Sequence, residues 1–79
     1  DLPTGRFYVI VHSSIDRDLV LDSCRKYNKE GLNCKVILSG AHAQFNRLSL
    51  ADYDNVAAAQ NGAYTFQPRF GPTVWVLQY

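Results

Sequence analysis

The first third of the chain carries a strand pattern followed by a helix pattern. Residues 6–12 (RFYVIVH) are β-branched or aromatic almost throughout, which favours a β-strand. Residues 16–30 then repeat apolar side chains at i, i+4 and i+7, the spacing of one helical face, at Val20, Cys24 and Tyr27. These two patterns predict a strand that leads directly into an amphipathic helix.

Polar residues and a glycine mark the ends of this predicted helix. Ser14 or Asp16 can cap its N-terminus, because either side chain can accept a bond from a backbone N–H of the first turn. Asp18 falls in the first turn and Lys29 in the last, where each charge is favourable with the helix dipole. Gly31 is a natural C-terminal stop.

The rest of the chain predicts three further strands and a second helix. The strands are expected at residues 34–38 (CKVIL), 44–50 (QFNRLSL) and 73–79 (TVWVLQY), with a small polar turn at 39–43 between the first two. An alanine-rich stretch at 54–66 permits a short, closely packed helix.

The second helix has weaker signals than the first. Asp52 and Asp54 resemble a capping pair at its start. Gly62 and Thr65 lower its helical propensity. Pro68, followed by Gly71 and Pro72, is expected to end it.

The predicted order is therefore β-α-β-β-α-β. Two helices cannot cover both faces of a four-stranded sheet, so we expect them to share one face and to leave the other open to water. The sequence thus predicts an α+β fold of ferredoxin-like shape, with a four-stranded antiparallel sheet and both helices on one side.

Alternation along the strands assigns side chains to the two faces of this sheet. We expect the following residues to form the core beneath the helices: Val9, Val11, Leu48, Leu50, Val74 and Val76. The opposite, open face is expected to carry these residues: Tyr8, Ile10, His12, Phe45, Arg47, Ser49, Trp75 and Leu77. The open face would therefore display three aromatic rings around a single cation, Arg47.

Exposed aromatic rings beside an arginine suit a sugar ligand. A sugar ring presents an apolar C–H face that stacks on a flat aromatic surface, and its polar substituents need hydrogen bonds. Arginine supplies five donors in a rigid fork that can pair bidentately with a carboxylate. Two alternatives stay open: loops or chain ends cover the aromatics, or they lie singly on the surface, as is common in globular proteins.

Composition narrows the class of protein. The chain has 79 residues, 47% of them hydrophobic and 19% charged, which suits one folded domain. We expect residues 1–5 to be a linker remnant and residues 6–79 to form the domain. No apolar run approaches the roughly 18 residues needed to span a bilayer, and the first residues lack a signal-peptide pattern. Membrane contact is therefore expected only through parts of a parent protein outside this chain.

The charge balance argues against a nucleic-acid partner. A net charge of +1 leaves no basic stripe, and the first and third strands lack the glycine-aromatic pattern of an RNA-recognition module. We therefore expect no nucleic acid, although bases could stack on the same aromatic face.

Catalysis, metals and cofactors are not expected. Cys24 and Cys34 match no metal motif and are interpreted as two small buried hydrophobes, with a disulfide as the alternative in an oxidising compartment. His12, Ser13 and Asp16 lie close in sequence, but adjacent strand residues point to opposite faces, so His12 cannot serve Ser13 as a base. Strand exit and helix capping account for these residues.

Two half-repeats resemble the SPOR (sporulation-related repeat) family. The first is residues 8–14 (YVIVHSS) with the helix and Gly31-Leu32 that follow, and the second is residues 46–53 (NRLSLADY) with the alanine-rich helix. Residues 74–77 (VWVL) look like the family's closing Ala-Trp-Val-Leu strand. The resemblance extends over about residues 6–79.

This resemblance implies binding of peptidoglycan, especially glycan strands stripped of stem peptides, in the periplasm or cell envelope and without catalysis. Arg47 matches the family's third-strand arginine, Trp75 its last-strand aromatic, and Ser13 the serine of Gly-Ser-Phe. Phe45 lies where some members carry an aromatic. The family pattern differs at other positions: glutamine is Ile10 here, the two glycines are His12 and Ala51, the second serine is Asp52, and the first phenylalanine is Ser14.

The sequence therefore predicts a monomeric, non-catalytic module that binds glycan on its open sheet face. Phe45, Arg47 and Trp75 are expected to carry the binding. Tyr8, Ile10, Ser13 and Ser49 are expected to be their neighbours. The alternative, from a different class, is a protein-interaction or ligand-sensing domain of ferredoxin-like shape that dimerises through the open sheet.

Overall fold

The computed structural model describes residues 3–38 and 45–79 and contains four strands and two helices. In chain order these are β1 (Phe7–Ser14), α1 (Arg17–Lys29), β2 (Lys35–Ile37), β3 (Asn46–Tyr53), α2 (Val56–Phe70) and β4 (Trp75–Gln78). The predicted β-α-β-β-α-β order is confirmed. The turn predicted at 39–43 and the first residue of the strand predicted at 44–50 lie outside the described residues.

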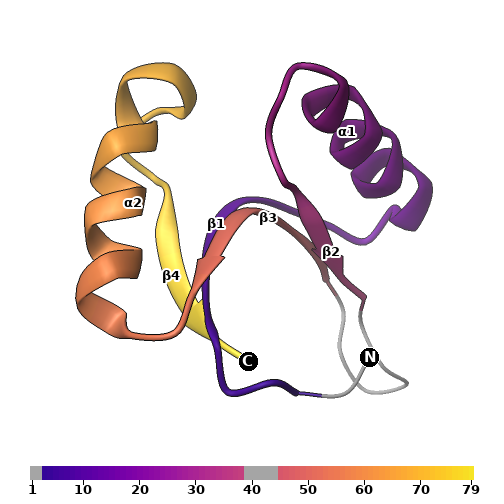
Figure 1. Ribbon diagram of the computed structural model, residues 1–79. Helices are drawn as coiled ribbons and strands as arrows, with labels where there is room; N and C mark the ends of the chain where they lie inside the picture. The colour runs from indigo at the N-terminus through magenta and orange to yellow at the C-terminus, as the bar shows by residue number, and fades with distance from the viewer. Residues whose placement is uncertain (1–2, 39–44) are drawn as a thin grey trace.

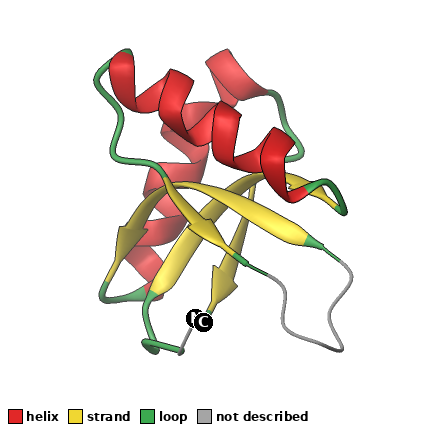
Figure 2. Ribbon diagram, turned by 90° about the vertical axis from the view of Figure 1, so that its right-hand side faces the viewer, coloured by secondary structure: helices red, strands yellow, loops and turns green. Residues whose placement is uncertain are grey.

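The strands form one antiparallel sheet in the order β2-β3-β1-β4. Both helices lie on the same side of this sheet (Figures 1 and 2), with α1 against β3, β1 and β2 and α2 against β1, β3 and β4. The sheet is curved, and both described chain ends lie on the side away from the helices. The predicted fold class, with one face left free of helices, is confirmed.

The main core lies between the helices and the sheet and matches the predicted positions. Val9, Leu48, Leu50 and Val74 are at most 8% exposed, and Val20 of α1 is fully buried among them. The partly buried residues packed on this core include the remaining predicted positions, Val11, Val76, Cys24 and Tyr27. Burial of this contiguous apolar surface is the main source of stability for so small a domain.

Helix α1 begins as the sequence indicates. The Asp16 carboxylate accepts a hydrogen bond of 3.2 Å from the backbone N–H of Leu19, so Asp16 is the N-cap. Ser14 supports the cap from outside the helix, since its hydroxyl accepts a 3.0 Å bond from the N–H of Asp16. Both proposed capping residues therefore act at this helix start.

Helix α2 differs from its predicted form at both ends. Its N-cap is Asn55, which accepts a 2.8 Å bond from the N–H of Ala58, and not the pair Asp52 and Asp54. The helix also continues through Pro68 to Phe70, so the prediction that this proline ends it is wrong.

The last turn of α2 remains helical despite Pro68 because its aromatic side chain packs against neighbouring rings. The Phe70 ring lies 6.0 Å from Phe66 and 5.2 Å from Tyr27 of α1, both edge to face. These contacts offset the single backbone hydrogen bond that Pro68 removes. Gly71, which was also predicted to end the helix, is its C-cap, and its φ of 95° is a conformation that suits glycine.

Irregular pairing between β1 and β3 changes the face of one predicted residue. The register shifts between Val9 and Ile10 and again between Ile10 and His12. His12 consequently pairs with Leu48, a core residue beneath the helices, because paired residues of antiparallel strands point to the same side. The prediction that His12 lies on the open face is therefore wrong.

The same shift brings Ser13 opposite Arg47 on the helix-free face. His12 and Ser13 thus point to opposite faces, as expected for neighbours in a strand, although the side taken by His12 is reversed. Ser13, a predicted site residue, therefore lies beside Arg47, as the site prediction required.

The N-terminal segment packs against the C-terminal end of the sheet. Thr4 and Gly5, within the segment interpreted as a linker, donate backbone N–H bonds to the carbonyl of Tyr79. Tyr79 in turn donates its N–H to the carbonyl of Arg6. These bonds hold the described N-terminal residues along the end of β4.

Asp52 of β3 forms ion pairs with Lys35 of β2 and with Arg6, the residue that precedes β1. Its carboxylate lies 2.6 Å from Nε of Arg6 and 2.9 Å from Nζ of Lys35, with its own side chain 7% exposed. Burial opposes ionisation of Asp52, but hydrogen bonds from Lys35 and Arg6 outweigh it and hold the pKa of this carboxyl below its ordinary value. Asp52 therefore stabilises the sheet, in place of its predicted role as a helix cap.

We expect Asp52→Asn to lower the free energy of unfolding at pH 7 by about 1–2 kcal/mol, because both cations lose their partner but can return to water. The native pKa lies below the unfolded value of about 3.9, so this stabilisation is complete above that value and disappears as pH falls through the native pKa. Urea unfolding at pH 7 and pH 3 measures both effects. The exposed neighbour Asp54→Asn serves as the control, and an equal loss in both variants would contradict the prediction.

Close packing between α2 and β3 requires a glycine at position 62. A Cβ built on Gly62 would lie 2.4 Å from the Tyr53 hydroxyl and 2.7 Å from the carbon that bears it. The backbone of Gly62 has a negative φ, so alanine would otherwise favour the helix there.

Gly62→Ala should therefore destabilise the protein by about 1–3 kcal/mol, because the Tyr53 ring must move out of a packed position. The exposed position next to it provides the comparison, since Asn61→Ala should be neutral or stabilising. Thermal unfolding of both variants tests this, and a Gly62→Ala protein that is more stable than the parent would show that the close approach has no cost.

Candidate functional site

Arg47 and Trp75 meet on the face of the sheet that no helix covers. Arg47 extends from β3 and Trp75 from β4, on either side of the central strand β1. The guanidinium carbon of Arg47 lies 5.9 Å from the centroid of the Trp75 ring. This distance is within the range of a cation–π interaction, so the two side chains hold each other in place.

Several side chains of this site are exposed to solvent. Trp75 is 42% exposed and Phe45, which immediately precedes β3, is 44% exposed. Ser13 is exposed and lies opposite Arg47 across the β1–β3 pair. An aromatic ring, a guanidinium and a hydroxyl thus meet solvent on the helix-free face, and alternation along β3 places Phe45 on the same side as Arg47.

Arg47 has hydrogen-bonding capacity left over. Its Nε is buried, and it has no hydrogen-bond partner among the described residues. A buried donor without a partner costs free energy, and because Nε is enclosed, a ligand would contact the rest of this half-buried side chain.

Two predicted site residues form the floor of the face. Ile10 and Ser49 pair with each other across β1 and β3 and are both fully buried. Ser49 donates its hydroxyl to the carbonyl of Ala51 at 2.9 Å, which leaves it occupied within the sheet. Neither side chain can touch a ligand, so both support the site from below.

Tyr8 is also buried, at 5% exposure, and the prediction that Tyr8 and Ile10 are displayed to solvent is wrong. A second apolar cluster fills the middle of this face. It joins Tyr8, Ile10 and Ile37 to the partly buried Leu77 and Tyr79. Curvature of the sheet (Figure 1) brings these side chains together, and the Tyr8 hydroxyl bonds the Thr4 hydroxyl at 2.8 Å.

Sequence reasoning missed two charged groups on this face. Lys35 pairs with Ser49 and Asp52 pairs with Tyr8, so both lie on the helix-free side. Arg47 is therefore not the single cation expected there. Alternation from Val36 would have placed Lys35 correctly, whereas the side taken by Asp52 depends on the register shift that no local pattern indicates.

The two cysteines are free thiols. Cys34 is buried and Cys24 half-buried, and the Cys24 thiol donates to the carbonyl of Cys34 at 3.2 Å. Burial raises the pKa of the Cys34 thiol to about 11 and also raises the pKa of Cys24. Both cysteines therefore pack as small apolar side chains, as the sequence predicted.

The described residues contain neither a membrane-spanning helix nor a cluster of metal ligands. Neither described helix combines the length and the apolar composition needed to cross a bilayer. In residues 3–38 and 45–79 no three His, Cys, Asp or Glu side chains gather closely enough to hold a metal ion.

Comparisons of the chain with protein-family models, with curated proteins and with solved structures found no match.

Trp75 is the only tryptophan in the chain, so its fluorescence reports on this site alone. Because the Arg47 guanidinium attracts anions to the ring, Arg47→Ala should lower the iodide quenching constant about twofold while leaving quenching by neutral acrylamide nearly unchanged. Arg25→Ala, on exposed helix α1, provides a charge-matched control. Equal iodide quenching in the parent and Arg47→Ala would show that the two groups do not interact in solution.

Proposed function

We propose that this domain binds the glycan strands of bacterial peptidoglycan on its helix-free face, without catalysis, and thereby holds a parent protein at the cell wall. The observation that carries the proposal is the half-exposed Trp75 ring beside the Arg47 guanidinium. The resemblance of the half-repeats to SPOR domains supports the same ligand. A periplasmic or envelope location follows from that ligand.

The chemistry of the site matches an N-acetylated sugar. The apolar face of a sugar ring can stack on Trp75, and the exposed Phe45 supplies a second ring on the same side. Ser13 and the Arg47 fork then offer hydrogen bonds to hydroxyl and acetamido groups.

Arg47 also explains a preference for glycan without stem peptides. Removing the peptide from a muramic acid leaves a free lactyl carboxylate, which a guanidinium can bind through two parallel hydrogen bonds. An intact stem replaces that charge with an amide and adds bulk beside Trp75.

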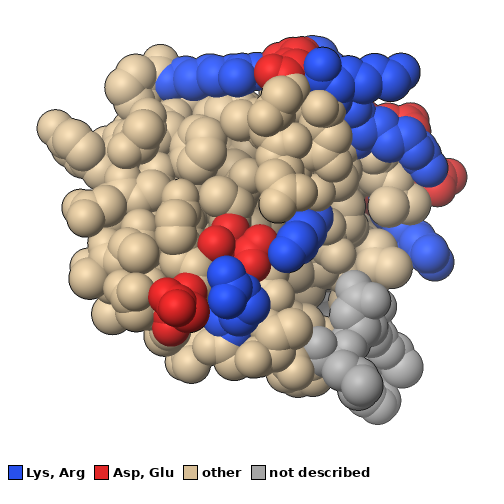
Figure 3. Space-filling view, in the orientation of Figure 1, with Lys and Arg blue, Asp and Glu red and all other residues tan. Residues whose placement is uncertain are grey.

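The structure favours glycan over the other two ligand classes considered. A sheet-to-sheet dimer would need a broad apolar face, but Tyr8 and Ile10 are already buried within the protomer. Nucleic acid would need a continuous basic surface, whereas acidic and basic side chains lie next to one another on the side of the molecule drawn in Figure 3. On the helix-free face itself, the Asp52 carboxylate pairs with both Lys35 and Arg6 and lowers the net positive charge there.

Retention on isolated sacculi, with and without amidase treatment, tests this proposal. We expect stronger retention on amidase-treated sacculi and loss of that difference in Arg47→Ala. Trp75→Ala should weaken binding to both materials by about 1–3 kcal/mol, as for other aromatic stacking platforms.

The chain offers matched controls on the helix side of the molecule. Tyr64 of α2 is an aromatic residue with 75% exposure, and Arg25 of α1 is an exposed arginine, so Tyr64→Ala and Arg25→Ala should bind like the parent. Equal retention on both materials that Arg47→Ala leaves unchanged would reject glycan binding at this face. A stable dimer that ignores sacculi would support the interaction-domain alternative instead.

A further inference from the structure

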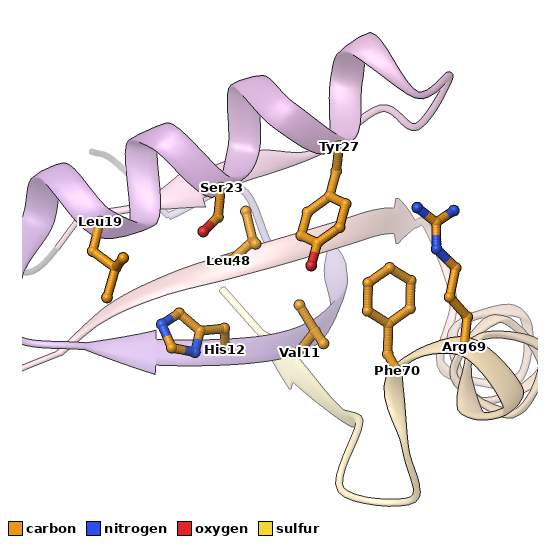
Figure 4. Close-up of a pocket in the computed structure, with 8 residues that line it drawn as sticks. All are labelled: Val11, His12, Leu19, Ser23, Tyr27, Leu48, Arg69 and Phe70. Carbon is orange, nitrogen blue, oxygen red and sulfur yellow. The ribbon is translucent and has the colours of Figure 1, made fainter.

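A hollow of about 430 Å³ lies on the opposite side of the sheet from the proposed glycan site. Its walls come from α1, from the middle of β1 and β3, and from the last turn of α2 (Figure 4). Its volume lies within the range of about 300–1,000 Å³ typical of small-molecule sites. The lining residues are Val11, His12, Leu19, Ser23, Tyr27, Leu48, Arg69 and Phe70.

Three polar groups surround the middle of this hollow. The Ser23 and Tyr27 side chains point down from α1 toward β1, and the His12 ring lies on β1 below them (Figure 4). No hydrogen bond joins these three side chains to another residue that the structure describes. Each can donate a hydrogen bond, and the two hydroxyls and a neutral imidazole can also accept one, so all three groups are available to a polar ligand.

The irregular pairing of β1 places His12 in this hollow. Regular alternation after Val11 would send the imidazole to the helix-free face, but the register shift between Ile10 and His12 directs it toward α1. Such bulges frequently serve to re-aim a side chain at a functional site. The local irregularity therefore accounts for the presence of an imidazole among the lining residues of the hollow.

The other lining residues of the hollow are apolar, except for Arg69, which is held by an ion pair. Leu19 closes one end, Val11 and Leu48 form the floor, and Phe70 forms the other end (Figure 4). Arg69 lies at the rim, where it forms an ion pair with Glu30 and stacks 5.7 Å from the Tyr27 ring and 5.0 Å from the Phe70 ring. These contacts join the ends of the two helices and keep that end of the hollow in shape.

We propose that this hollow binds a small organic carboxylate with an apolar body. No acidic side chain lines it, and the His12, Ser23 and Tyr27 side chains that face it from β1 and α1 can each donate a hydrogen bond to a carboxylate. The apolar part of the ligand then lies over Val11 and Leu48. Because the sheet separates this site from Arg47 and Trp75, it is independent of the glycan site.

Chemical-shift titration of the isotope-labelled chain tests the proposal with three probes. Phenylacetate carries both features, phenylacetamide keeps the ring without the charge, and acetate keeps the charge without the ring. We expect phenylacetate to shift the amide signals of β1 and α1 around His12 and Ser23, with Kd at least tenfold lower than for either other probe. Signals around Phe45–Arg47 should not move.

Conservative variants assign the contacts. Tyr27→Phe and Ser23→Ala each delete one hydroxyl while leaving the packing intact, and each should raise the Kd for phenylacetate about tenfold. Tyr64→Phe makes the same chemical change as Tyr27→Phe elsewhere on the surface and should leave Kd unchanged. Phenyl phosphate, as a further arm, separates a carboxylate site from a general anion site: tighter binding of the phosphate would overturn the assignment.

Three other results would overturn the proposal. The first is no shift of the β1 and α1 signals up to about 20 mM phenylacetate, well above any useful Kd. The second is equal binding of phenylacetamide, which would remove the role of the carboxylate. The third is unchanged affinity in both Tyr27→Phe and Ser23→Ala, which would place the ligand elsewhere.

Discussion

The antiparallel pairing of β1 with β3 at the centre of the sheet determines what each face of this protein presents. Its two register shifts lie within the four residues from Val9 to His12. The first shift leaves an extra residue on β3 and changes the side taken by Asp52, and the second leaves an extra residue on β1 and changes the side taken by His12. The pairing therefore directs His12 toward the helices and Ser13 toward Arg47. The composition of both candidate sites depends on this short irregular stretch.

The helix-free face combines a closed centre with an accessible edge. Curvature of the sheet buries Tyr8 and Ile10, and the ion pairs of Asp52 with Arg6 and Lys35 join the strands beside them. Ligand contact is thereby limited to the region of Trp75. A surface of this kind suits a narrow chain such as a glycan strand better than a flat protein partner, because the apolar area needed for dimerisation is already used internally.

Much of the fold and part of the candidate site could be predicted from local patterns. The apolar spacing of α1 and the alternation of the strands identify the core and the element order, and Arg47 and Trp75 emerge together on one face. The fate of Tyr8 could not be predicted, because its burial depends on side chains from distant strands. The extent of α2 was also missed, since Phe70 is held by Tyr27, a residue far away in the sequence.

The sequence by itself determined that two helices must share one face of a four-stranded sheet, because its hydrophobic periodicities allow only that layering. It also determined that an arginine and a tryptophan lie on the other face. Only the tertiary structure decided which of their neighbours reach solvent and on which side His12 and Asp52 lie. Register and curvature arise from pairing between strands, so they are properties of the assembled sheet and of no single segment.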